Sequence, residues 1–232
     1  HQVRGFVTIP SGWFQMGSND GQNDEQPVHF VWVDTFEIAT FPVTRREYSA
    51  FIAATERERP RDWHNRDFDR SQLPVVGVSW NDAYVYCLWR SSEGEEVRLP
   101  TEAEWERAAR GLRGGQRYPW GNEIPGWIPN NGKGPLNAPW EVHLGLANDF
   151  GIHGIGANIH EWCADWHGKT YYGSSPQRNP TGPKTGVRRT SRGGSWRHAV
   201  TISRNAARSK LDPGFRYTDY GFRLARSSGI RS

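Results

Sequence analysis

Short stretches in which apolar and polar residues alternate open the chain, and such alternation is typical of β-strands. Residues 5–18, with the sequence GFVTIPSGWFQMGS, alternate on both sides of a Pro-Ser-Gly turn and predict a β-hairpin. Residues 28–38, VHFVWVDTFEI, alternate again and predict one further strand. The N-terminal part is therefore expected to consist of short strands.

Three later segments predict helices, because each begins with Ser or Thr followed three residues on by an acidic residue. These pairs are Thr44 with Glu47, Ser79 with Asp82, and Thr101 with Glu104. Sequences with helical periodicity follow the three pairs, namely YSAFIAAT, AYVYCLWRSS and WERAARG. The third helix is expected to end at Gly111, since glycine commonly terminates helices.

The remaining segments predict much irregular structure. Residues 111–156 combine Gly, Pro and Asn with Trp, and this aromatic content favours a packed irregular segment over a disordered one. Residues 157–166 hold a short apolar-aromatic run, and residues 168–190 predict another loop. The stretch from Arg192 predicts two or three strands that end in GFRLAR. Because no linker or internal repeat is visible, we expect one domain over residues 1–232.

Length and charge narrow the function classes. The 232 residues include twelve Trp, ten Phe and eight Tyr, which supply ample apolar area for a core. The net charge is +4 and the basic residues are scattered, so nucleic acid is not expected as the main partner. No apolar run reaches the roughly 18 residues that a membrane span needs. The chain begins at His1, so a targeting segment could have been removed. The sequence does not determine the compartment, and a soluble periplasmic or secreted protein is one hypothesis.

The most informative segment for function is 192–226, RGGSWRHAVTISRNAARSKLDPGFRYTDYGFRLAR. It mixes arginines with Gly, Ser and aromatic residues and contains no cysteine. Surface arginines that only solvate a fold need no such neighbours, so the segment indicates a cleft that binds a small molecule or a peptide. The sequence determines neither the ligand nor the oligomeric state.

The chain resembles the formylglycine-generating enzyme family, also called sulfatase-modifying factors. The matching elements cover nearly the whole chain and run in the order IPSGWFQMGS, FPVTRREYSAFI, PVVGVSWNDAYVYCLW, RLPTEAEWERAARG, YPWGNE, NDFGIHGIGANIHEW, RGGSW, RNAARS and GFRLA. RLPTEAEWERAARG together with RGGSW and GFR is highly specific. The resemblance implies an α+β fold related to C-type lectins, with few short helices and small antiparallel sheets.

The same resemblance removes the activity for which the family is best known. In its thiol-oxidising members, two cysteines bind copper and oxidise a substrate cysteine with oxygen. Val200 matches the second of these cysteines and the first has no counterpart, so thiol-dependent formylglycine generation is not expected. Asn205 matches a structural cysteine whose partner corresponds to Cys87. Cys87 is therefore expected to be a buried thiol outside any disulfide, and burial is also the favoured interpretation for Cys163.

What remains of the family's site is a polar cleft. The resemblance implies candidate catalytic residues and candidate ligand contacts, which are respectively Ser195, His198 and Asp219, and Arg197, His160 and Trp196. Two histidines and one carboxylate also form the ligand set of non-haem iron enzymes, so a redox metal of unknown identity is one hypothesis. The alternative is that His160 packs in the core and His198 lies on the surface rim.

A structural calcium ion is a second cofactor that the resemblance implies. Glu161 matches a family side-chain ligand, and Ala157 and Ile159 match two carbonyl donors. Gly154 replaces a further side-chain donor, which weakens the site because calcium prefers six to eight oxygen ligands. The alternative is that Glu161 caps a backbone group or pairs with an arginine.

Most other charged residues in these motifs are expected to be structural. Arginine forks satisfy backbone carbonyls and carboxylates well, and a loop-rich fold has many carbonyls to satisfy. This applies to Arg192, Arg204, Arg208, Arg216 and Arg223. The acidic residues at helix starts are expected to cap helices or to interact with the helix dipole; they are Asp82, Glu102, Glu104 and Glu106.

Three functions fit the sequence. The first is a tailoring oxidoreductase that acts on a small or peptidic metabolite, since some cysteine-less relatives are linked to oxidation steps in siderophore maturation. The second is a non-catalytic binding module, since variable proteins diversified by retroelements share the RGGSW and GFRLA frame. The third is a catalytically silent paralogue that binds partners of the active enzyme. We favour the first, because SRGGSWRHAV and FRYTDYGFR lack the character of randomised positions.

Overall fold

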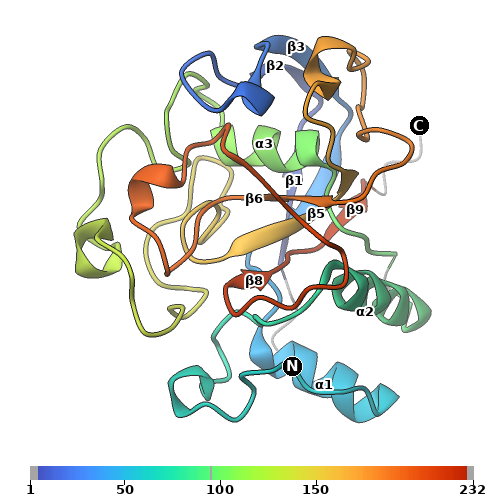
Figure 1. The fold of residues 1–232 in the computed structure, drawn as a ribbon, viewed down its shortest axis with the longest axis vertical. Coiled ribbons are helices and arrows are strands. Elements are labelled where there is room, and N and C mark those ends of the chain that lie inside the picture. The colour runs from blue at the N-terminus through green and yellow to red at the C-terminus, as the bar shows by residue number, and fades with distance from the viewer. Residues whose placement is uncertain (1–4, 95, 229–232) are drawn as a thin grey trace.

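Within residues 5–94 and 96–228, which a computed structural model describes, the strands form three small sheets (Figure 1). The first sheet has the order β1 (Phe6–Ile9), β4 (Phe36–Ala39), β9 (Ala225–Ser227). The second pairs β2 (Gly12–Met16) with β3 (His29–Val33). The third has the order β7 (Arg208–Leu211), β6 (Arg189–Arg192), β5 (His160–Trp166), β8 (Tyr220–Gly221). All pairs are antiparallel except β5 with β8, which is parallel.

The predicted N-terminal hairpin is wrong. β1 and β2 follow each other in sequence, but β1 pairs with β4 and β2 pairs with β3. The single strand predicted over residues 28–38 is likewise two strands, β3 and β4, which belong to different sheets. Strand pairing here follows burial: Ile9 on β1 and Ile38 on β4 are both fully buried in the same core cluster.

All three predicted helices are confirmed, together with their capping boxes. They are α1 (Arg45–Thr55), α2 (Trp80–Ser92) and α3 (Glu102–Arg110). In each, the side chain of the residue before the helix accepts a hydrogen bond from the third helical residue, whose carboxylate accepts one in return. The helices thus begin where local hydrogen bonding is strongest.

The largest sheet lies between α3 on one side and α1 and α2 on the other (Figure 1). On one side, Trp162 of β5 packs in a cluster with Tyr48 of α1 and Tyr86 of α2. On the other side, Cys163 of β5 packs with Trp105 of α3. Since neighbouring residues of a strand point to opposite faces, β5 contributes to both cores.

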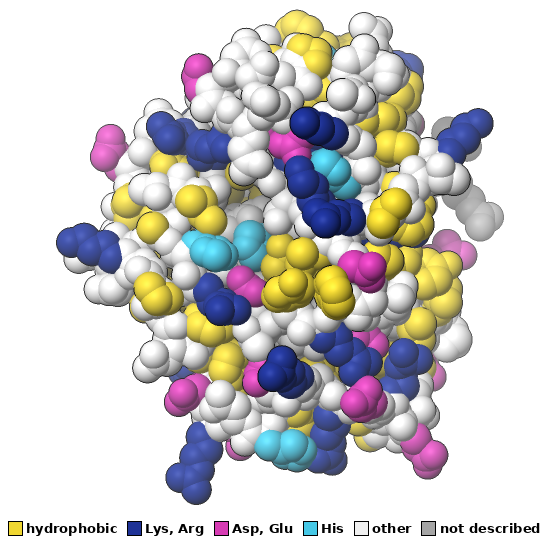
Figure 2. All heavy atoms as spheres, viewed as in Figure 1, with side chains coloured by type: hydrophobic (Ala, Val, Ile, Leu, Met, Phe, Trp, Pro, Cys, Tyr) yellow, Lys and Arg dark blue, Asp and Glu magenta, His cyan; other side chains and the backbone are white. Residues whose placement is uncertain are grey.

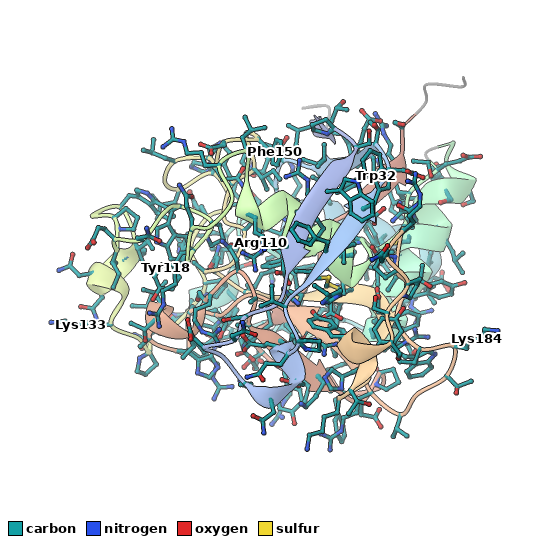
Figure 3. The ribbon with its side chains drawn as sticks, turned by 90° about the horizontal axis from the view of Figure 1, so that it is seen from above. Trp32, Arg110, Tyr118, Lys133, Phe150 and Lys184 are labelled. Atoms are coloured by element: carbon teal, nitrogen blue, oxygen red, sulfur yellow. The ribbon has the colours of Figure 1, made fainter. Side chains whose placement is uncertain are left out.

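Long irregular segments enclose this frame and are well packed, as the sequence predicts. Residues 111–156 contain one short 3-10 helix, η3 (Pro129–Gly132), in the described chain. The Asn158 side chain joins both backbone groups of Trp140, with distances of 3.0 and 2.7 Å. Seen from above, Tyr118 and Lys133 of residues 111–156 lie on one side and Lys184 of residues 167–188 on the other (Figure 3). Among the described helices, none is long and apolar enough to cross a membrane.

Candidate functional site

The structure brings together three residues that lie far apart in sequence: His160, His198 and Asp219. His160 opens β5 and is the register partner of Tyr220 on β8. Its backbone N–H donates to the Asp219 carbonyl at 3.0 Å. His198 lies in the turn that leads into η5 (Val200–Ile202). The pairing of β5 with β8 therefore positions His160 and Asp219, and a turn positions His198.

The three side chains are spaced as a potential metal centre. Asp219 Oδ2 lies 3.9 Å from His160 Nε2 and 3.7 Å from His198 Nε2. One ligand atom of each residue lies within 4.8 Å of the others. Figure 2 shows two histidine side chains side by side near the middle of this face, next to an acidic side chain, a basic one and a group of hydrophobic ones.

His160 is held as a neutral imidazole. Its ring is buried and stacks on Tyr220, with 4.7 Å between the ring centroids. Burial lowers the pKa of His160 to about 4, against the opposing effect of the Asp219 charge, and the nearby His198 lowers it further. A neutral imidazole keeps a lone pair that can bind a metal near pH 7. His160 is thus both a packed residue and an available ligand.

Ser195 and Arg197 occupy different places around Asp219. The buried Ser195 hydroxyl donates to Asp219 Oδ2 at 2.7 Å and accepts the Arg197 backbone N–H at 3.3 Å. Ser195 does not line the cavity described below, and its contact in the structure is with Asp219. The Arg197 side chain is exposed, reaches Thr218 Oγ1 at 3.3 Å and lines the cavity, as predicted for a ligand contact.

A cavity of about 510 Å³, the histidine cavity, opens beside His160, His198 and Asp219. That size lies within the usual range for small-molecule sites. Its walls come mainly from residues 192–226, the segment predicted to form a cleft, together with His160 and Gln22. The lining residues that the sequence did not single out are Gln22, Ile202, Ser209, Leu211, Tyr217 and Tyr220. The aromatic residues that flank Asp219 in RYTDYG were the one available signal, since aromatic rings commonly line ligand sites.

Trp196 is not brought to this cavity. Its side chain is buried in the third core cluster, where it packs edge-on against Phe68 at 5.9 Å. Its backbone N–H donates to the Asn158 carbonyl at 2.9 Å. The structure therefore places Trp196 in the core and not at the cavity, whereas the next two residues, Arg197 and His198, both line the cavity.

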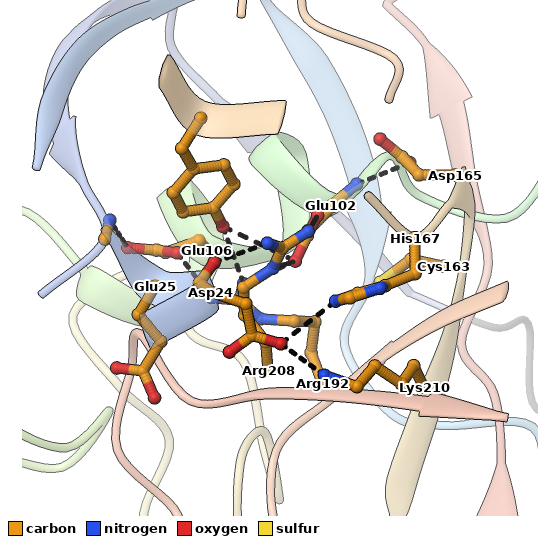
Figure 4. Close-up of polar contacts among 12 residues, drawn as sticks. Asp24, Glu25, Glu102, Glu106, Cys163, Asp165, His167, Arg192, Arg208 and Lys210 are labelled. Atoms are coloured by element: carbon orange, nitrogen blue, oxygen red, sulfur yellow. Dashed lines mark hydrogen bonds and ion pairs between the residues drawn. The ribbon is translucent and has the colours of Figure 1, made fainter. Parts of the chain in front are cut away.

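Buried ion pairs form the support behind the cavity (Figure 4). Arg192 is fully buried and bridges Glu102 and Glu106 of α3, the first at 2.9 Å. Arg208, which also lines the cavity, forms two hydrogen bonds to Glu102 at 2.7 and 2.9 Å. Arg204 pairs with Glu25, Arg216 with Asp82, and Arg223 with Glu161. The structural interpretation of these arginines is confirmed, and Glu102 and Glu106 exceed the helix-dipole role predicted for them.

Acid is expected to weaken the fold through Glu102. Burial alone would raise the pKa of this carboxyl, but Arg208 and Arg192 lower it from 4.5 to about 2. Between these two values the unfolded chain binds a proton that the folded chain does not, so stability falls as the pH decreases. We expect Glu102→Gln to be less stable at neutral pH and to lose part of this pH dependence. Urea unfolding at a series of pH values measures both effects, and parallel profiles for the two proteins would contradict the assignment.

The segment predicted to bind calcium has a different contact. Both carboxylate oxygens of Glu161 are engaged by Arg223, at 2.7 and 2.8 Å, and one also accepts the Trp105 indole N–H at 2.7 Å. The side chains of Ala157 and Ile159 are buried in the third core cluster. In this arrangement Glu161 does not fit the role of a calcium ligand, because a cation would have to displace the arginine. Calcium binding at this segment stays a prediction.

A comparison with known families assigns the chain. A family model described as the sulfatase-modifying factor enzyme 1-like domain matches residues 1–228. The chain belongs to the sulfatase-modifying factor family. The predicted resemblance and the C-type-lectin-like α+β fold that it implied are thereby confirmed.

Relatives of this sulfatase-modifying factor protein differ in their names. The formylglycine-generating enzyme of Streptomyces coelicolor is 35% identical, over 99% of this chain and 91% of that protein. The solved structure of PvdO from Pseudomonas aeruginosa superimposes with a TM-score of 0.81 at 28% identity, over 96% of this chain and 94% of that one. Treponema denticola variable protein 1 gives a TM-score of 0.82 at 24% identity, with the same coverage, and shares the fold.

The thiols of this family member lie away from the histidine cavity. Cys87 and Cys163 are both buried and form no disulfide. Burial raises the pKa of Cys163 well above its usual value, so this thiol stays protonated. Val200 is buried in the third core cluster, and the Asn205 amide donates to the Gln116 carbonyl at 2.9 Å. No thiol of the described residues lines the histidine cavity.

Proposed function

We propose that this protein is an oxidoreductase that modifies a small or peptidic metabolite at a mononuclear iron centre. His160, His198 and Asp219 would hold the iron. The observation that carries the proposal is the convergence of these three side chains at the edge of a cavity large enough for a substrate. Two histidines and one carboxylate with open positions are the ligand set typical of non-haem iron enzymes.

The residues present fit such a centre after a small adjustment. Ligands that share a metal at about 2.1 Å lie roughly 3 to 3.4 Å apart, which is closer than the spacing in the cluster. His198 can move toward Asp219, because its side chain is 45% exposed and lies in a turn. His160 Nε2 and Asp219 Oδ2 are 3.9 Å apart and must also approach each other, which requires a rotation of the Asp219 carboxylate that the Ser195 hydroxyl now holds.

An oxidative reaction fits both the ligand set and the family. The 35% identical relative is named for generating formylglycine, an aldehyde, and aldehyde formation is oxidative chemistry. In the proposed reaction one carbon–hydrogen bond and one adjacent N–H or O–H bond of the substrate break, and a C=N or C=O double bond forms. The substrate thereby loses two electrons and two protons. Dioxygen accepts them and leaves as hydrogen peroxide. Iron, when bound, supplies the route for electrons between substrate and dioxygen.

Side chains of the cavity have separate parts in this reaction. Arg197 offers exposed guanidinium donors to acceptor groups of the substrate. Tyr217 and Ile202, which are 41% and 45% exposed, offer apolar surface at the cavity. The substrate class is therefore a molecule with an apolar portion and hydrogen-bond acceptors.

Metal loading tests the proposal. The protein is purified without metal, loaded with iron(II) under anaerobic conditions, and its metal content is measured by mass spectrometry. We expect one iron per chain and a nitric oxide adduct visible by electron paramagnetic resonance. Oxygen uptake with candidate dehydrogenation substrates then reports turnover.

Two outcomes would contradict the proposal. The first is an absence of stoichiometric iron binding, and the second is flat oxygen uptake by the loaded protein with every substrate that binds. A protein that binds ligands in the histidine cavity without iron would instead be a binding module, which is the alternative function that the sequence left open.

A further inference from the structure

A second and larger cavity lies on another side of the molecule. It has a volume of about 890 Å³ and shares no lining residue with the histidine cavity among the described residues. Its walls come from α2, the β3–β4 turn, residues 97–101 and the start of β6. α2 and β9, which both contribute to it, lie on the right of Figure 1. Nothing in the proposed reaction uses this space.

One wall is an apolar face of α2. Trp80, Tyr84 and Leu88 follow each other at a spacing of four residues and therefore lie on one face of the helix. Tyr84 stacks on Trp80 with 5.2 Å between centroids and 8° between planes, which makes a flat aromatic surface. Tyr84 and Leu88 are 47% and 52% exposed. Exposed helix faces are usually polar, so this face indicates a binding surface.

One cation in this cavity has unused hydrogen-bonding capacity. Arg189 lies between two indole rings, 3.7 Å from the Trp80 centroid and 3.5 Å from that of Trp166. Its Nη1 donates to the Ala164 carbonyl at 2.7 Å, and its Nε is buried without a partner. Burial raises the pKa of the neighbouring Asp165 well above its usual value, and Asp165 Oδ2 accepts the Glu102 backbone N–H at 2.8 Å. No carboxylate of the described residues forms an ion pair with Arg189.

The other charged groups of the cavity are already paired. Arg98 donates to both carboxylate oxygens of Glu104, at 2.6 and 2.7 Å. Asp34 accepts from the Trp32 indole and from the Asn179 amide, both at 2.7 Å. A ligand in this cavity would therefore contact a largely apolar wall and the guanidinium of Arg189, which can bind an anion.

We propose that this cavity binds an amphipathic carboxylic acid, with its apolar body along Tyr84 and Leu88 and its carboxylate on Arg189. Arginine is suited to this, because its planar donor fork matches a carboxylate. The volume lies within the range of ligand pockets, and such pockets combine apolar walls with a few polar groups. The site is independent of the histidine cavity and of the reaction proposed there.

Calorimetric titration with octanoate and with 1-octanol tests the assignment. These two probes share an apolar chain and differ in the carboxylate. We expect octanoate to bind and octanol to bind at least about tenfold more weakly. Arg189→Gln is expected to remove this difference. Leu88→Trp fills the cavity from an exposed helix position and is expected to abolish binding of both probes.

Two control variants make the result specific. Leu146→Trp adds the same ring at a position that is 77% exposed and lines neither cavity, so octanoate should bind as in the unchanged protein. His198→Ala alters only the histidine cavity and should also leave octanoate binding intact. Equal affinity for octanoate and octanol, or no effect of Leu88→Trp, would overturn the proposal. Loss of octanoate binding in His198→Ala would overturn it as well, by placing the ligand in the other cavity.

Discussion

Asp219→Asn is expected to reduce iron affinity by more than about 100-fold and to abolish any iron-dependent turnover. The substitution keeps the shape of the side chain, and its amide oxygen can still accept the Ser195 hydroxyl. It removes the one negative charge among the three ligands. No neighbouring group replaces this charge, because the other charged residues that line the cavity, Arg197 and Arg208, are positive. Equilibrium dialysis of iron(II) against the metal-free protein measures the affinity.

Further variants separate a metal role from a structural one. His198→Ala removes a second ligand at an exposed position and should lower iron affinity while leaving the unfolding midpoint nearly unchanged. Asp67→Asn, at an exposed residue that does not line the cavity, should leave both quantities unchanged. Iron binding by Asp219→Asn that equals that of Asp67→Asn would remove the carboxylate from the proposed centre.

Arg192→Met is expected to lower the free energy of unfolding by about 3–5 kcal/mol. Arg192 is fully buried, bridges Glu102 and Glu106, and donates to the Asn205 carbonyl at 2.7 Å. Methionine fills part of the space but leaves two buried carboxylates with fewer partners, and an uncompensated buried charge is costly. Urea unfolding at neutral pH, followed by circular dichroism, measures the loss.

Two comparisons identify the cause of that loss. Adding Glu106→Gln to Arg192→Met should cost less than the sum of the two single changes, because the pair removes opposite charges together. Arg70→Met breaks a surface pair with Glu141 at 3.5 Å, in which the arginine side chain is 58% exposed, and should cost at most about 1 kcal/mol. If Arg192→Met proved no more harmful than Arg70→Met, the buried network would not be a main support of the fold.

Local hydrogen bonding explains which parts of the fold were predictable. The helices that begin after Thr44, Ser79 and Thr101 are encoded by side chains three residues apart, and all three were predicted. The pairing of β1 with β4 joins residues about thirty positions apart, and no nearby turn specifies it. The Pro-Ser-Gly sequence after Ile9 therefore led to the wrong strand partner, since β1 and β2 follow each other there without pairing.

In the candidate site, too, the residue types could be predicted from the sequence but their long-range contacts could not. Two of the three candidate metal ligands, His198 and Asp219, were predicted from the segment that carries RGGSW and GFR, and His160 from the element that ends in HEW, but their convergence was not predicted. It depends on the pairing of His160 with Tyr220, which the sequence does not reveal. Trp196 was misplaced because a turn lacks the periodicity that separates inward from outward residues in strands and helices. The second cavity was missed entirely, since widely separated segments between Val33 and Ser227 contribute its walls.

The pairing of β5 with β8 has a consequence for how such a protein can diversify. His160 begins β5 and Asp219 directly precedes β8, in a sheet whose strands also carry the cores, so large changes of either side chain would disturb the fold. His198 stands on the turn between Ser195 and Val200, outside the strands. Substitutions in this turn can therefore change the chemistry of the site, while the sheet keeps the imidazole of His160 and the carboxylate of Asp219 in place.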